Sequence, residues 1–192
     1  MPSDLQVDTI KDASASNTLV EQSGSDWVWG SGVPAGSVAH AGIIDIPAVS
    51  INCYEASAAV IGGTITHDGG GQVLGDTTIT PKLTTSKFLF SVNVHVDKNV
   101  GTSYAEKLAL WHTQSGTNTL VIETFWYRRV ANTESLPHVG TGFINNTNGD
   151  AFTVKIRGYT QDNNNFLIGM MNGTNGTNSN KTSSFLYWEV AT

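Results

Sequence analysis

The strongest constraint on the fold is an alternating stretch in the middle of the chain, KFLFSVNVHVD at 87–97. Apolar residues occupy every second position from Phe88 to Val96, and the positions between them are polar except at Leu89. Successive side chains of a β-strand point to opposite faces, so this period of two predicts a strand with one buried face. An amphipathic helix would instead repeat its apolar residues about every three or four positions.

Strand-like segments continue along most of the chain. Only 14% of the residues are charged and 20 are glycine, a composition that favours strands and turns over helices. Turn-forming stretches such as QSGTN, NNTNGD and QDNNN separate the segments. We therefore expect an all-β fold, an antiparallel jelly-roll sandwich of about eight to ten strands. Besides 87–97, the expected strands lie within 48–54, 59–67, 73–81, 105–113, 119–129, 140–147, 150–160, 165–173 and 183–191.

The first 40 residues have a different character. The stretch SDLQVDTIKDASASNTLVEQSG is polar and weakly alternating, and a short strand–turn–strand unit of this kind is marginally stable on its own. We therefore divide the chain into an extended N-terminal arm, residues 1–40, and a jelly-roll domain, residues 41–192. Alternatively, the two tryptophans of the arm cap the end of the main domain. The arm is expected to attach to a partner or to its own copies through Leu5, Val7, Ile10, Leu19, Val20, Trp27 and Trp29.

Charge and cysteine usage narrow the classes of partner. The formal net charge is −6 and the only adjacent basic pair is Arg128-Arg129, which argues against nucleic acid as a partner. The single cysteine, Cys53, follows apolar residues and is expected to be a buried, inert thiol. The start of the sequence has no signal-peptide pattern, and no stretch approaches the roughly 20 apolar residues of a membrane span. We therefore expect folding in a reducing cytoplasm and no membrane insertion.

Two parts of the sequence resemble known proteins. The final run FLYWEV at 185–190 and the strand KFLFSVNVHV at 87–96 resemble the jelly roll of the complement and tumour-necrosis-factor type. The leader LQVDTIKDASASNTLVEQSG at 5–24 resembles the opening of many tailed-bacteriophage virion proteins. The resemblance implies a non-enzymatic virion protein without a cofactor, assembled in the bacterial cytoplasm. It would be a tail fibre, spike or capsid-decoration protein, and its arm would bind other phage capsid or tail proteins.

The resemblance also implies a homotrimer, because in that jelly-roll family three sandwiches pack around an axis through aromatic and aliphatic residues of one sheet. The segments 119–129 and 183–191 carry large apolar groups on both faces, and 150–160 carries Tyr159 on an otherwise polar face. Surplus aromatic area of this kind is typical of an interface. The alternative is that loops fold over these faces. The expected interface residues are Phe125, Trp126, Tyr127, Tyr159, Phe185 and Tyr187.

Signals for catalysis or metal binding are weak. The stretch HDGGGQ brings His67 and Asp68 together, but a metal would need a third ligand from elsewhere, and a plain hairpin tip is the alternative. His112 shares a strand face with Leu108 and Leu110 and is expected to lie in the core or at its rim. The acidic residues are scattered, with no pair that indicates glycoside cleavage. We therefore expect no catalytic residues and no metal.

A carbohydrate-binding module is the alternative function. The loops at 161–166 and 172–181 are rich in amides and hydroxyls, which suit sugar hydroxyl groups, and an aromatic ring there can stack on a sugar. The alternative explanation of the same composition is that these loops are ordinary surface turns. A host surface glycan would then be bound by Asp162, Asn163, Asn164, Asn165 and Phe166.

Overall fold

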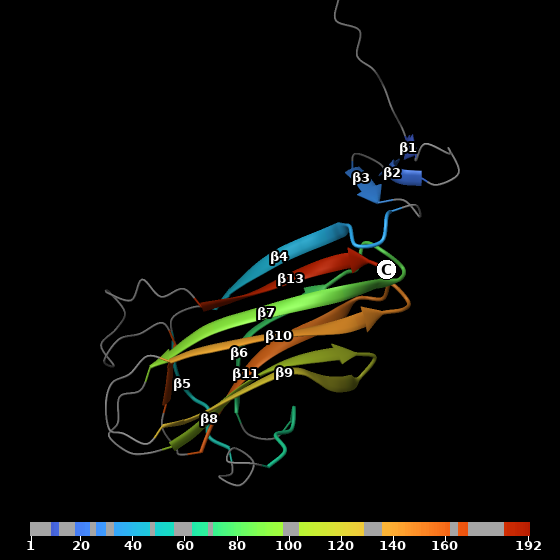
Figure 1. Ribbon diagram of the computed structural model, residues 1–192. Coiled ribbons are helices and arrows are strands. Elements are labelled where there is room, and N and C mark those ends of the chain that lie inside the picture. Colours follow the sequence, from blue (N-terminus) through green and yellow to red (C-terminus); the bar gives the residue numbers. More distant parts are fainter. Residues whose placement is uncertain are drawn as a thin grey trace, which may run out of the picture.

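The computed structural model is all-β and describes most of the chain (Figure 1). The described residues are 9–11, 18–23, 26–29, 33–46, 49–55, 63–68, 71–97, 104–128, 136–161, 165–168 and 183–192. Within these ranges there is no helix, and so no helical segment long and apolar enough to cross a membrane.

The N-terminal region contains a small antiparallel sheet in the order β1-β2-β3. Its strands are β1 (Thr9–Lys11), β2 (Thr18–Ser23) and β3 (Asp26–Trp29). No described strand of this sheet pairs with a strand of the other two sheets. The predicted strand–turn–strand unit therefore has a third strand. Of the predicted anchor residues, Ile10, Leu19, Val20, Trp27 and Trp29 lie on these strands, whereas Leu5 and Val7 lie outside the described residues.

Two further sheets form the sandwich. The first sheet has the order β4-β13-β7, and β10 pairs with the other side of β7 along its whole length. The second sheet has the order β6-β11-β8-β9. The first sheet consists of β4 (Val38–Ile46), β13 (Ser183–Ala191), β7 (Ser86–Asp97) and β10 (Leu136–Asn146), extended at one end of β7 by β12 (Asn165–Ile168) and β5 (Val49–Asn52). The second consists of β6 (Gln72–Ile79), β11 (Phe152–Thr160), β8 (Tyr104–Gln114) and β9 (Thr117–Arg128).

The strand order is that of a jelly roll. In each sheet, strands from the beginning of the sandwich lie beside strands from its end: β4 pairs with β13, and β6 pairs with β11. The middle strands β7 and β10 likewise pair in one sheet, and β8 and β9 in the other. Eight main strands wound in this way make a double Greek key, so the predicted fold class is confirmed. Because β4 begins at Val38, the predicted boundary between residues 40 and 41 falls inside a strand of the sandwich.

The core lies between the two sheets and contains the alternating face of β7. Phe88, Phe90, Val92, Val94 and Val96 are all buried, as the period of two predicted. They pack against apolar residues of the second sheet, and the Phe88 and Phe152 rings meet edge to face with centroids 4.9 Å apart. Each such side chain contributes roughly 1.5–3 kcal/mol by leaving water.

A second, smaller cluster covers part of the outer face of the second sheet. The segment 63–68, which lies between β5 and β6, crosses this face and buries Ile65 against Ala105, Ala109, Trp111 and Tyr159. Trp111 Nε1 donates a 2.9 Å hydrogen bond to the Tyr159 hydroxyl, which donates in turn to the Thr66 carbonyl at 3.3 Å. The side chain of Tyr159 is therefore completely buried within the chain. The expectation that it serves an interface is wrong, because a distant segment of the same chain covers it.

Candidate assembly interface

The outer face of the first sheet carries a row of apolar side chains that runs across all four main strands. Trp188 of β13 is paired with Ala41 of β4 on one side and with Leu89 of β7 on the other. Leu89 is in turn paired with Phe143 of β10. Directly paired residues share one face of a sheet, so Ala41, Trp188, Leu89 and Phe143 form one line, which we call the apolar row.

The next line of paired residues continues this apolar surface. Leu186 lies between Ile43 and Ser91, which is paired in turn with Thr141. Ile43 is 59% exposed and Phe143 is 57% exposed, far more than a core residue. The two lines therefore place large apolar groups in water over the middle of the sheet.

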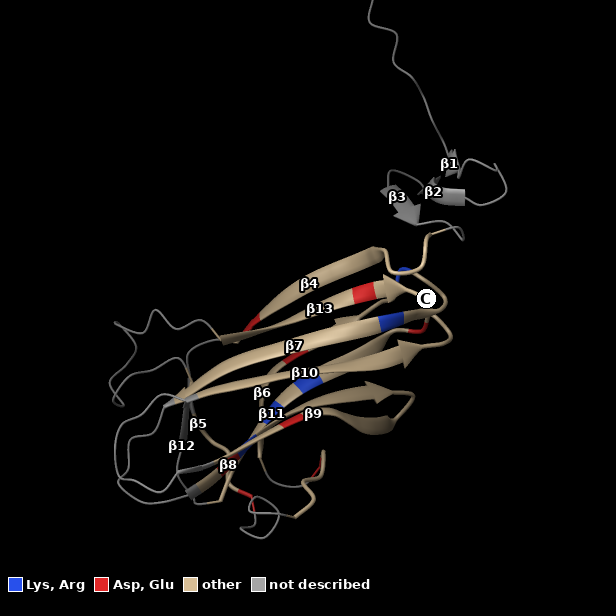
Figure 2. Ribbon diagram, in the orientation of Figure 1, with Lys and Arg blue, Asp and Glu red and all other residues tan. Residues whose placement is uncertain are grey.

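Charged residues are few along the strands of the first sheet (Figure 2). Of the outward residues within 38–46, 87–95, 137–145 and 184–190, only Asp45 and Lys87 are formally charged. The Lys87 ammonium lies over the Phe143 ring, 4.7 Å from its centroid, and so covers part of the apolar row with its own stem. A solvated sheet face normally alternates to polar residues, so a face like this one has the character of an interface.

Apart from Tyr159, the predicted interface residues fall into three groups. Phe125 and Trp126 of β9 are exposed by 44% and 41%, as an interface residue must be in the isolated subunit. The side chain of Tyr127 lies outside the described residues. Phe185 and Tyr187, however, take the inward positions of β13 and are buried in the core, so assigning them to an interface is wrong.

Sequence reasoning therefore chose the wrong face of β13 and missed the apolar row. Both faces of this strand are apolar, so its sequence does not say which one points inward. Its register with β7 decides this, because Phe185 is paired with buried Val92 and Trp188 with exposed Leu89. The one available signal was Leu89 itself, the single apolar residue on the otherwise polar face of 87–97.

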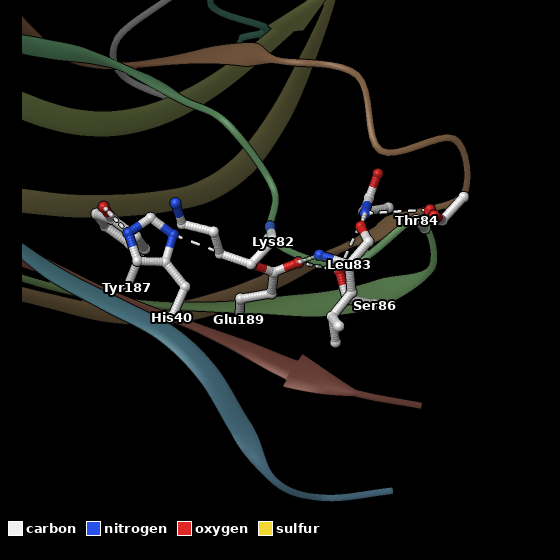
Figure 3. Close-up of polar contacts among 8 residues, drawn as sticks. His40, Lys82, Leu83, Thr84, Ser86, Tyr187 and Glu189 are labelled. Carbon is white, nitrogen blue, oxygen red and sulfur yellow. Dashed lines mark hydrogen bonds and ion pairs between the residues drawn. The ribbon is translucent and has the colours of Figure 1, made fainter. Parts of the chain in front are cut away.

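A buried carboxylate fixes the end of β13 beneath this face (Figure 3). The Glu189 side chain has no exposed surface and accepts hydrogen bonds from Lys82 N at 2.8 Å, Leu83 N at 3.0 Å and Ser86 Oγ at 2.9 Å. His40 Nδ1 lies 4.0 Å from the second oxygen, Oε2. Several donors around one carboxylate offset the cost of burying it. The network therefore ties the turn before β7 to β13 and β4.

A second buried polar network joins β8, β9 and β10. His138 Nε2 lies 3.1 Å from Glu106 Oε1, and His138 Nδ1 lies 2.7 Å from the Thr124 hydroxyl. The order acid, imidazole, hydroxyl is that of a nucleophilic triad. Glu106 and His138 have no exposed surface, however, so a substrate has no access to them in this conformation. The arrangement therefore links β8, β9 and β10 through buried hydrogen bonds.

The weaker sequence signals do not converge on a site. His67 Nδ1 lies 2.8 Å from Asp68 Oδ1, but the described residues contain no group of three or more His, Cys, Asp and Glu that could hold a metal. Cys53 is buried as predicted, and this burial raises the pKa of its thiol to about 12. The His112 ring lies 5.0 Å from that of Phe152 at the core rim, and burial lowers the pKa of the imidazole.

The predicted glycan-binding residues are largely outside the described part of the chain. Asp162, Asn163 and Asn164 fall in a gap, and Asn165 and Phe166 are placed only by their backbone in β12. The glycan-binding alternative therefore stays a prediction.

Comparisons with known proteins add little to this picture. No family model and no curated protein matches the chain. Among solved structures it is similar to the VP2 subviral particle of infectious bursal disease virus, with 11% identity and a TM-score of 0.37 over 92% of this chain and 47% of that one. The Gt strain structure of the same virus gives 8% identity and a TM-score of 0.37 over 92% of this chain and 44% of that one. The Gx strain structure gives 11% identity and a TM-score of 0.35, covering 100% and 47%.

The chain thus spans less than half the length of these viral proteins. At TM-scores this low the likeness carries neither a function nor an assembly over to this chain, and the fold assignment rests on the strand order described above.

Proposed function

We propose that this chain is a non-enzymatic structural subunit of a virion that assembles as a homotrimer and is anchored by its N-terminal arm. The observation that carries the proposal is the apolar row on the outer face of the first sheet, which the described part of the chain leaves uncovered. The corresponding face of the second sheet is covered in part by the segment 63–68. Fully burying a side chain of this size is worth up to roughly 1.5–3 kcal/mol, so the burial of Phe143 and Ile43 would contribute to association through this face.

A closed ring of three copies needs two different patches on each copy, because its contacts are heterologous. The apolar row supplies one patch. The other is supplied by Phe125 of β9, the edge strand of the second sheet, which is exposed and is paired with Lys107 on the outer face of that sheet. In the proposed trimer the β9 edge of each copy packs against the apolar row of the next.

The virion assignment is supported by the leader and by the fold. The leader resembles the opening of tailed-bacteriophage virion proteins, and jelly rolls are common in viral capsids. The described strands of the arm form a small sheet, and none of them pairs with a described strand of the sandwich, which suits attachment to another capsid or tail protein. We propose the bacterial cytoplasm as the place of assembly and a fibre, spike or decoration role.

Solution mass measured by light scattering tests the proposed trimer. The full chain is expected to have a mass of three copies or a multiple of three, and Phe143→Glu is expected to lower its mass by placing a charge in the apolar row. Gln72→Glu adds the same charge at an exposed position of β6 and should leave the mass unchanged. A monomeric wild-type chain, or a Phe143→Glu variant that stays trimeric, contradicts the proposed interface.

A chain that begins at Val33 tests the role of the arm. If the sandwich holds the trimer, this shortened chain still has a mass of three copies or a multiple of three but no longer joins virion particles. Loss of the trimer would instead make the arm the oligomerisation element.

A host-glycan receptor role is the second candidate, favoured by the two exposed aromatic side chains on β9, which suit stacking on a sugar ring. Binding to a glycan array that is lost in Trp126→Ala would support it. The absence of binding to every bacterial surface polysaccharide on the array would exclude it.

A further inference from the structure

The outer edge of β4 offers a second kind of contact. β4 is the terminal strand of the first sheet and pairs with β13 along one edge. No described strand pairs with its other edge along 40–46. An unpaired edge presents backbone N–H and C=O groups that can accept another strand.

A β-bulge at Ala39 and a contact of Ile46 with Gly75 of β6 lie at the two ends of this edge. Between them, the stretch 40–45 lacks the features that normally prevent such pairing. Natural proteins protect edge strands with lysine, proline, irregular pairing or a cover. Along 40–46, HAGIIDI contains no proline, lysine or arginine and one formal charge, Asp45. The other edge strand of the same sheet, β10, carries Pro137 and packs against β9 through Gly140 and Gly142.

We infer that β4 pairs with β4 of a second copy, antiparallel, around a two-fold axis at Ile43. In this register Ile43 lies opposite the partner's Ile43, Gly42 opposite the partner's Ile44, and Ala41 opposite the partner's Asp45. Ile43, which is 59% exposed in the single chain, is then covered by its own copy. Apolar cross-strand pairs of this kind stabilise a sheet.

The charges of this register are compatible. Each Asp45 faces an alanine, and the two Asp45 residues are offset by four positions along the strands. At about 3.3 Å per residue this offset is roughly 13 Å. That exceeds the Debye length of about 8 Å at physiological ionic strength, so the carboxylates repel each other little.

The two-fold contact goes beyond the proposed trimer and does not rest on it. It would join the first sheets of two copies into one continuous sheet with one continuous outer face. A chain that has both a three-fold and a two-fold contact builds a shell or lattice, whereas a three-fold contact alone stops at one ring.

Charge-swap variants of the full chain test this inference. Phe143→Glu is introduced throughout to remove association through the apolar row. In that background Ile43→Lys and Ile43→Glu should each be monomeric, because each places like charges opposite one another. An equimolar mixture should form a dimer that contains one copy of each. A two-fold axis at this edge brings residue 43 directly opposite its own copy, so a mixture that stays monomeric overturns the inference.

Cysteine cross-linking gives a second readout that captures a weak contact. Ile43→Cys should form a covalent dimer under mild oxidation, whereas the control Val73→Cys, an exposed apolar position on β6, should not. The native Cys53 has no exposed surface and does not compete. Absence of the Ile43→Cys dimer, or equal cross-linking of the control, contradicts the edge contact. A different result is that the Ile43→Cys dimer forms but Phe143→Glu leaves the mass of the chain unchanged. That result would support the edge contact and contradict the proposed trimer interface.

Discussion

Gly140 of β10 lies directly against Ile122 of β9: a Cβ atom added at Gly140 would stand 2.5 Å from Ile122 Cγ2. This approach closes one side of the sandwich, where the edge strands of the two sheets meet. A side chain at residue 140 would force the strands apart. The glycine is thus required by the distance between the strands, and no turn is involved.

Gly140→Ala is expected to lower the free energy of unfolding by about 1–3 kcal/mol, the usual cost of overpacking a core. Gly75→Ala is the matched control, because a Cβ atom there would meet Ile46 at 3.5 Å, an ordinary contact. Urea unfolding of both variants measures the difference. Equal stability of the two variants would show that β9 and β10 can move apart at Gly140 without a loss of stability.

Glu189→Gln should lower the free energy of unfolding, although it only replaces one carboxylate oxygen by an NH₂ group. The carboxylate accepts three hydrogen bonds, from two backbone amides and Ser86. The amide NH₂ group that replaces one oxygen cannot accept, so a buried donor loses its partner at a cost of about 1–3 kcal/mol. Thermal unfolding should show this loss, while the exposed Asp76→Asn should unfold like the wild type. An unchanged Glu189→Gln melting curve would contradict the role of the network.

Tyr159→Phe tests how segment 63–68 is held on the second sheet. The substitution removes the acceptor of the Trp111 indole N–H and the donor to the Thr66 carbonyl. We expect a loss of about 1–3 kcal/mol and faster cleavage by protease within 63–68. Tyr54→Phe, at a half-exposed tyrosine, is the control and should leave both measurements unchanged. Wild-type protease resistance in Tyr159→Phe would mean that the hydrogen bonds do not hold the segment.

Stability should fall in alkali. Burial raises the pKa of Cys53 from 9.0 to about 12 and also raises the pKa values of Tyr159 and Tyr187 above 10.0. As the pH rises through 9 and 10, the unfolded chain loses these protons first, so the free energy of unfolding decreases. At about 1.4 kcal/mol per pKa unit, Cys53 accounts for a loss of about 4 kcal/mol by pH 12.

Urea unfolding at a series of pH values from 7 to 11 measures this slope. Cys53→Ala should flatten it most between pH 9 and 10, where the tyrosines of the unfolded chain only begin to lose their protons. An identical slope in Cys53→Ala would mean that the thiol does not titrate differently in the folded chain.

Local alternation was enough to predict most of the main strands and the inward face of β7. It did not predict β4 (Val38–Ile46), and 63–67, the described part of the expected strand 59–67, is not a strand. The apolar residues at every second position from Phe88 to Val96 make up the whole of one strand face. Because a two-sheet fold has one interior, that face must point into it. The predicted segment 183–191 coincides with β13. The buried state of Cys53 followed from its apolar neighbours in the same way.

Contacts between distant segments decided the rest. Phe185 and Trp188 are equally apolar, and only the pairing of β13 with β7 turns the first inward and the second outward. Tyr159 is buried by a segment more than 90 positions earlier, through its hydrogen bond to the Thr66 carbonyl. Glu106 and His138 are polar residues in apolar strands, and their tie forms because β8 and β10 meet in the sandwich.

The sequence by itself therefore determined most of the segments that become strands, since the two-residue period is a property of neighbouring positions. The tertiary structure alone decided which outward face stays uncovered and which residues lie on it, because register and cover depend on segments far apart in the chain. The candidate interface belongs to that second kind of information.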